Sequence, residues 1–175
     1  DIEKIRRKFR PRFGKVNYGI KQAKIELSKK IFDAADDLKN EELHSFIDSN
    51  KYWLNDYALY KVLKQINNNR SWENFPVDHR NYDAEVLAGL ENQHEHEINF
   101  IYWLQWKLFC QLKQIKEYAS LKGIYIMGDL PFLVSRDSAG VWSHQKYFRL
   151  DLSSGAPPDL YLEKKKKWGM PPYDW

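Results

Sequence analysis

The first two-thirds of the chain alternates apolar and polar positions with the spacing of amphipathic helices. After Gly19, apolar residues recur on one side of a helical wheel, at Ile25, Leu27, Ile31, Phe32 and Ala35. Asn40 followed by two glutamates is typical of a helix start, because acidic side chains in the first turn interact favourably with the helix dipole. Residues 54–66 repeat the amphipathic pattern. We therefore expect helices after Gly19, after Asn40 and over 54–66.

The longest periodic stretch runs from about residue 84 to about residue 120. Its apolar face contains Ile98, Ile101, Tyr102, Leu108, Phe109, Leu112 and Ile115, and it is widened by Phe100, Trp103 and Leu104. This pattern predicts one long helix that is buried on most sides. Pro76 and several turn-forming residues predict a loop over 71–83. The charges, Pro and Gly of residues 6–19 predict an extended connector.

The periodicity changes at Lys122-Gly123. Residues 124–127 form a short apolar run that ends at Gly128, which predicts a buried strand over about 124–128. Prolines at 131, 157, 158, 171 and 172 fix the backbone of the remaining residues, so we expect loops there. The pattern thus predicts a mostly helical stretch up to about residue 120, followed by a strand and loops.

Composition narrows the class of protein. The chain has 175 residues, of which 43% are hydrophobic, enough for the core of one ordinary domain. No segment approaches the ~18–20 uninterrupted apolar residues of a membrane span. Cys110 is the only cysteine, which suits a reducing and therefore cytoplasmic setting, or a plastid if the source is a plant. The chain opens on Asp1 and not on Met, and its last residues, YDW, form neither a cap nor a polar tail, so we expect a piece of a longer protein.

Positive charge is concentrated in two places. Residues 1–30 have a local net charge of +8 and Lys164–Lys167 add +4, whereas the whole chain carries only +4. Nucleic-acid binding usually needs a basic face running through the domain, and this distribution does not predict one. The lysine run is flanked by Tyr161 and Trp168, but one short run makes few phosphate contacts. A solvated loop is the favoured interpretation.

Neither a metal site nor a cofactor site is predicted. The run His94–Glu97 reads HEHE, but consecutive helical residues point about 100° apart, so His94 and His96 face different ways. The spacing of a zinc protease, His at i and i+4, is absent, and a solvated helix face is favoured. A glycine-rich phosphate-binding fingerprint is also absent, so we expect no cofactor.

Asp129 is the most informative candidate. It lies one residue beyond Gly128, at the end of the predicted strand, and Pro131 prevents the ladder from continuing. In parallel α/β barrels, binding and catalytic residues lie at the carboxyl ends of strands. The alternative is that Asp129 simply caps a turn, as Asp commonly does. From the residues alone the two interpretations are equally good.

Three motifs give the chain a family resemblance. GDLPFLVSRDSAGVWSH, FRLDLSSGAPPDLY and WGMPPYDW together resemble the 4-α-glucanotransferases, a family that includes amylomaltases and plant disproportionating enzymes. The resemblance is close over the last ~55 residues. It is looser upstream, through WLNDYALYKVLK and INFIYWLQWKLFCQLKQIKEYASLKGI.

The resemblance implies an α/β fold, a fragment of a (β/α)8 TIM barrel with a largely helical inserted subdomain. On that template, residues 1–118 are the mostly helical insertion, and residues 119–175 hold a barrel strand at about 124–128 and the loops that line the cleft. It implies transfer of α-1,4-glucan segments from a donor to the 4-hydroxyl of an acceptor sugar, with retention, by way of a covalent glycosyl-enzyme. The implied ligands are glucose, maltooligosaccharides and α-1,4-glucans. Catalytic residues are implied only beyond Trp175, so none is assigned in this chain. Substrate binding is assigned to Asp129, Pro131, Asp159 and Trp168.

Trp168 resembles a tryptophan of the loop that arches over the acceptor side of the cleft, where it is suited to stack on a sugar ring. The family commonly has Gly-Gln where this chain has Lys165 and Lys166. Lysine offers a charged point donor in place of an amide, and the glycine's backbone freedom is lost.

Two other functions are compatible with these motifs. One is an α-glucan hydrolase of the same barrel type, in which water takes the place of the acceptor sugar. The other is a non-catalytic module, either a fragment that only holds glucan or a basic binding domain. A cut barrel exposes sheet edges, so we expect the isolated piece to fold poorly.

Overall fold

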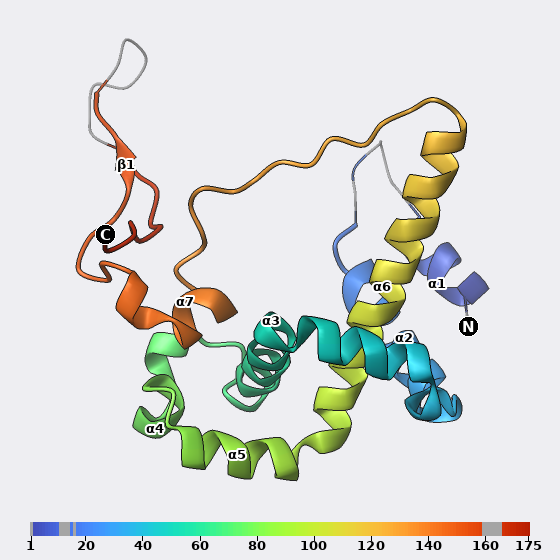
Figure 1. Cartoon of the computed structure of the whole chain (residues 1–175), viewed down its shortest axis with the longest axis horizontal. Helices are drawn as coiled ribbons and strands as arrows, with labels where there is room; N and C mark the ends of the chain where they lie inside the picture. The colour runs from blue at the N-terminus through green and yellow to red at the C-terminus, as the bar shows by residue number, and fades with distance from the viewer. Residues whose placement is uncertain (1, 11–14, 16, 159–165) are drawn as a thin grey trace.

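The computed structural model describes residues 2–10, 15, 17–158 and 166–175, and within them the chain is mostly helical (Figure 1). The α-helices are α1 (Ile2–Lys8), α2 (Ile20–Ala34), α3 (Glu41–Ile66), α4 (Val77–Arg80), α5 (Ala84–Gln93), α6 (Glu95–Leu121) and α7 (Ala139–Ser143). The 3-10 helices are η1 (Asp37–Lys39), η2 (Trp72–Asn74) and η3 (Gln145–Tyr147), and two short antiparallel strands are β1 (Gly155–Ala156) and β2 (Lys166–Lys167).

The long helix α3 is the centre of the fold. It begins as predicted at Asn40, whose side-chain Oδ1 accepts a hydrogen bond from the backbone N–H of Glu42 at 2.8 Å. The two helices predicted after Asn40 and over 54–66 form one helix of 26 residues. The helix predicted after Gly19 is confirmed as α2.

The predicted helix over 84–120 is divided into α5 and α6 at His94. The backbone of His94 has φ −118° and ψ 28°, which interrupts the helix. As a result, α5 and α6 run in different directions (Figure 1). The break lets both pieces bury apolar residues on α3, namely Leu87 from α5 and Ile98 from α6. Leu87 is 3% exposed and Ile98 is 6% exposed. A straight helix leaves the core after a few turns and cannot make both contacts.

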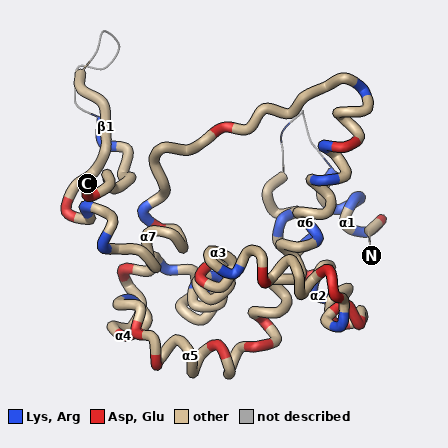
Figure 2. The backbone as a smooth tube through the Cα atoms, in the orientation of Figure 1, with Lys and Arg blue, Asp and Glu red and all other residues tan. Residues whose placement is uncertain are grey.

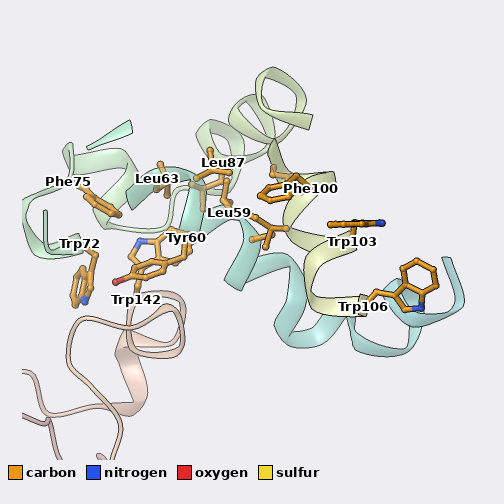
Figure 3. Packing of buried hydrophobic residues seen from close by; sticks show 14 of the residues in the cluster. Leu59, Tyr60, Leu63, Trp72, Phe75, Leu87, Phe100, Trp103, Trp106 and Trp142 are labelled. Carbon is orange, nitrogen blue, oxygen red and sulfur yellow. The ribbon is translucent and has the colours of Figure 1, made fainter. Parts of the chain in front are cut away.

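One continuous apolar core joins helices that are far apart in the sequence. Figure 3 shows Tyr60 and Leu63 of α3 between Trp142 of α7 on one side and residues of α5 and α6 on the other. Trp142 is completely buried, and its indole N–H donates to the His79 carbonyl at 2.8 Å. Aromatic rings dominate this core because large flat side chains bury the most area per residue.

The expectation that the long helix is buried on most sides is wrong for its second half. Leu108, Phe109, Leu112 and Ile115 of α6 are 46–57% exposed. The buried residues of α6 all belong to its first half. Phe109 still contacts Phe46 of α3, and beyond it the helix extends away from the core (Figure 1). Among the described residues, no helix combines the length and the hydropathy that a membrane span requires.

The strand predicted over about 124–128 is also absent from the described residues. Residues 122–137 instead cross in an irregular path from the end of α6 to α7 (Figure 1). Ile124, Tyr125, Ile126 and Met127 are 50–95% exposed. A strand exists only through ladder hydrogen bonds to a neighbour, and the described part of the chain offers this segment none.

Two further predictions need correction. Residues 6–8 of the expected extended connector belong to α1, in which Glu3 lies in the first turn and Arg6, Arg7 and Lys8 in the last, the order that favours a helix. The C-terminal loops contain β1 and β2, although each strand has only two residues. The division of the chain at residues 118 and 119 stays a prediction.

Asp137 attaches the irregular crossing to the helical core. Its carboxylate accepts hydrogen bonds from the Tyr60 hydroxyl and the Lys64 ammonium, both at 2.7 Å, and from the Trp72 backbone N–H at 3.2 Å. Burial alone raises the pKa of such a carboxyl, but these three donors outweigh it and lower the pKa of Asp137. The same burial and the adjacent carboxylate raise the pKa of Tyr60.

We predict that Trp142→Ala destabilises the fold by about 3–5 kcal/mol, the usual loss when a fully buried aromatic is truncated and leaves a cavity. Urea denaturation followed by circular dichroism measures this. Tyr52, which is 77% exposed on α3, provides the control, and Tyr52→Ala is expected to change stability by no more than about 0.5 kcal/mol. Equal losses in the two variants contradict the assigned core.

We also predict that the stabilisation given by Asp137 depends on pH. A carboxyl whose pKa is lower in the folded state stabilises the fold above its unfolded pKa of about 3.9, and this contribution disappears as pH falls through the folded pKa. The difference in unfolding free energy between wild type and Asp137→Asn is therefore largest at pH 7 and shrinks below pH ~4.

Urea titrations between pH 7 and pH 3 measure that difference. Asp48 serves as the matched control because its exposed side chain makes no ion pair or hydrogen bond among the described residues, and Asp48→Asn is expected to cost little at any pH. If the difference in unfolding free energy between wild type and Asp137→Asn stays constant from pH 7 to pH 3, the charged network does not contribute as proposed.

Candidate functional site

The crossing over residues 129–135 and a hairpin-like ribbon near the C-terminus lie next to each other. The ribbon pairs residues 147–156 with 166–174, through β1 and β2 and through backbone hydrogen bonds further along. Arg149 N–H donates to the Pro172 carbonyl at 2.9 Å, and Ser154 N–H donates to the Met170 carbonyl at 2.8 Å. The Trp168 N–H in turn donates to Ser154 at 2.9 Å. These bonds hold Trp168 at a defined place on the ribbon.

Three of the four residues predicted to bind substrate line one hollow. Asp129 and Pro131 come from the crossing, and Trp168 comes from the ribbon, about 40 residues later in the chain. The hollow measures about 620 Å³, and its other lining residues are Leu130, Phe132, Leu133, Lys166, Lys167 and Met170. Trp168 is 44% exposed, so part of its ring is open to a ligand. The fourth residue, Asp159, lies outside the described residues, as do Lys164 and Lys165.

Arg136 connects the crossing to its surroundings with a fork of hydrogen bonds. Its Nε and one terminal nitrogen donate to the two carboxylate oxygens of Glu73, at 3.1 and 2.7 Å. Its other terminal nitrogen donates to the Leu150 carbonyl at 2.7 Å. Each partner stabilises the other's charge, so the Arg136 guanidinium lowers the pKa of Glu73, and the Glu73 carboxylate raises the pKa of Arg136.

A larger cleft of about 1,100 Å³ lies on the other side of residues 131–135. Its walls contain Tyr57, Tyr60 and Lys61 of α3, together with residues of α7, η3 and the C-terminal Tyr173–Trp175. Pro131 and Leu133 line both this cleft and the smaller hollow. Burial lowers the pKa of Lys61, with help from the nearby Lys21 and Lys64, and burial raises the pKa of Tyr57.

The sequence did not identify the residues of α3 that line this cleft. Tyr57, Tyr60 and Lys61 fit an amphipathic helix, and the pattern alone does not distinguish a core face from the wall of a cleft. The three-residue spacing of Tyr57 and Tyr60, which places both rings on one side of the helix, is the only signal that they act together.

The other candidates contact neighbouring side chains. His96 lies 3.0 Å from Asp33, and His94 lies 3.8 Å from Glu97 within its own turn. The carboxylate of Asp137 accepts hydrogen bonds from Tyr60, Lys64 and Trp72. The described residues therefore present one unpaired carboxylate in the hollow, that of Asp129, and no carboxylate pair with it.

The two basic segments lie at opposite ends of the molecule. The N-terminal lysines and arginines are on α1 and α2, whereas Lys166 and Lys167 form β2 (Figure 2). Acidic residues lie along α4 and α5, between the two basic segments (Figure 2). A nucleic-acid face that joins both basic segments is therefore not formed by the described residues.

Comparison with known proteins places the chain in a family. Residues 2–175 match the family described as 4-alpha-glucanotransferase. A 4-alpha-glucanotransferase from Clostridium butyricum is 33% identical over 91% of this chain, and one from Thermus thermophilus is 33% identical over 93%. A solved amylomaltase from Streptococcus agalactiae, in complex with acarbose, superposes on 99% of the chain with a TM-score of 0.83 and 27% identity.

The chain spans about a third of the length of these relatives: 34% and 35% of the two enzymes and 38% of the solved structure. The family match over residues 2–175 includes both stretches that line the hollow. The chain belongs to the 4-alpha-glucanotransferase family.

Proposed function

We propose that the protein to which this chain belongs transfers α-1,4-glucan segments from a donor to the 4-hydroxyl of glucose or a maltooligosaccharide, with retention of configuration. One observation carries the proposal: Asp129 and Pro131 from one family motif and Trp168 from another line the same hollow. A carboxylate with an aromatic ring is the combination that binds a sugar, because the carboxylate accepts hydroxyl hydrogen bonds and the ring covers the apolar face.

In this proposal the chain supplies binding and not bond breakage. A retaining mechanism requires two carboxyls about 5–5.5 Å apart, a nucleophile and an acid/base, with an acceptor sugar resolving the glycosyl-enzyme. The nucleophile and the acid/base come from parts of the full-length protein outside this chain. Those parts also complete a (β/α)8 barrel, in which residues 124–128 gain the strand partners that they lack here.

Five residues of the hollow then have a role. Asp129 fixes the donor sugar through its hydroxyls, and Pro131 holds the backbone after Asp129 in one path. Trp168 stacks on the acceptor sugar, beside the ammonium groups of Lys166 and Lys167, which donate to acceptor hydroxyls. Asp159 stays a predicted substrate contact, and a cytoplasmic or plastid location stays a prediction.

Product analysis separates this function from its alternatives. With maltotriose as the only substrate, the full-length protein is expected to give glucose and a ladder of longer maltooligosaccharides at a constant number of reducing ends. A hydrolase produces one new reducing end for each bond broken, so a steady increase favours that alternative. Binding without any new product favours the non-catalytic module, and a steep salt dependence of oligonucleotide binding supports its basic-domain form.

We predict that Trp168→Ala raises the KM for the acceptor glucose about tenfold, corresponding to a loss of about 1.4 kcal/mol of stacking. The KM for the maltotriose donor is expected to change little. Steady-state kinetics in the full-length protein, with glucose and maltotriose varied separately, measures both constants. Trp168→Phe keeps an aromatic face and is expected to keep most of the acceptor affinity. An acceptor KM that is unchanged in Trp168→Ala removes the stacking role.

A further inference from the structure

The hollow has two walls that belong to different stretches of the chain. One wall is the crossing, at Asp129 to Leu133, and the other is the ribbon, at Lys166 to Met170. Each wall is attached to the helical core, the crossing through Asp137 and the ribbon through Phe148 and Leu150. Their separation at the hollow also depends on side chains that link one wall directly to the other.

Arg136 is placed to set that separation. It follows Leu133 by three residues. Its own backbone is held by Trp72, whose indole N–H donates to the Arg136 carbonyl at 2.8 Å. Its guanidinium reaches in two directions, to Glu73 of η2 and to the Leu150 carbonyl at the start of the ribbon. One side chain thus links the crossing, the helical layer and the ribbon.

The Leu150 carbonyl is closely connected to Trp168. Four residues after Leu150, Ser154 exchanges backbone hydrogen bonds with both Trp168 and Met170. Ser153 adds a further contact, because its hydroxyl oxygen accepts from the Gly169 N–H at 3.0 Å. A displacement of Leu150 is therefore transmitted to the Trp168 wall through a short, hydrogen-bonded stretch of backbone.

We propose that Arg136 is a positioning residue for the acceptor side, holding the Trp168 wall at a fixed distance from the Asp129 wall. This inference rests on the proposed function, because it assigns the hollow to sugars. The five N–H donors of arginine are arranged in a rigid planar fork, which bonds both Glu73 oxygens and a carbonyl at once. Lysine is a point donor on a flexible stem and does not hold both partners in that geometry.

The test compares Arg136→Lys and Arg136→Ala with wild type in the full-length protein. Both variants are expected to raise the KM for the acceptor glucose, by roughly tenfold or more, because small misplacements of a binding wall have large kinetic effects. The KM for the maltotriose donor is expected to stay within about twofold. Arg136→Lys keeps the charge opposite Glu73, so its melting temperature is expected to stay near that of wild type.

Arg149→Lys is the matched control. Arg149 also makes a forked pair on the ribbon, with Asp151 at 3.0 and 2.8 Å, but that pair stays within the ribbon and joins no second wall. Its acceptor and donor KM values are expected to match those of wild type.

The outcomes are distinguishable. If wild type gives no ladder of maltooligosaccharides, the proposed function fails, and this inference fails with it. If wild type is active but Arg136→Lys changes both KM values equally or neither, only the positioning role is overturned. Loss of folding in both Arg136 variants also overturns it, because Arg136 then acts on stability and not on the acceptor wall.

Discussion

The attachment of residues 136–142 to α3 is the constraint on which the candidate site depends. Asp137 accepts from Tyr60, Lys64 and Trp72, and five residues later Trp142 inserts its whole side chain into the core. The preceding crossing is exposed and without regular structure, so ordering it costs conformational entropy that its own contacts do not offset. The hydrogen bonds of Asp137 and the burial of Trp142 offset this cost at the C-terminal end of the crossing. This attachment positions residues 129–135.

The same attachment explains why a site made of loops has a defined shape. Binding residues are commonly found on loops that a rigid scaffold positions, and here the scaffold is the helical core of α2, α3, α5 and α6. After Trp142, no described element exceeds three residues, yet backbone hydrogen bonds pair residues 147–156 with 166–174 throughout. The ribbon is held by these bonds and by the packing of Phe148 on Tyr173, whose ring centroids lie 5.1 Å apart.

The sequence predicted the helices where local signals decide them. The Asn40 cap and the periodicity after Gly19 act within one or two turns, and both predictions were right. The break at His94 and the exposure of Leu108 to Ile115 depend on where α3 lies, which no local pattern contains. Residues 124–127 have every local property of a strand, but a strand also needs a neighbour. The motifs identified part of the lining of the hollow. Arg136 was missed because its role depends on Glu73, 63 residues away along the chain, and Tyr57 and Lys61 were missed because they share a cleft wall with distant residues.

In β2, the backbone of the two lysines pairs with β1, whereas their side chains line the hollow. Gly155 pairs with Lys167, and a Cβ at Gly155 would lie 2.2 Å from the Lys166 carbonyl oxygen, so only glycine permits this approach. The pairing uses the backbone of Lys166 and leaves its side chain free to line the hollow. A lysine at this position therefore does not disturb the ribbon, and its ammonium is a positive point donor that faces the same hollow as the Asp129 carboxylate. In the proposed function, the carboxylate accepts hydrogen bonds from the donor sugar, and the ammonium donates to the acceptor sugar.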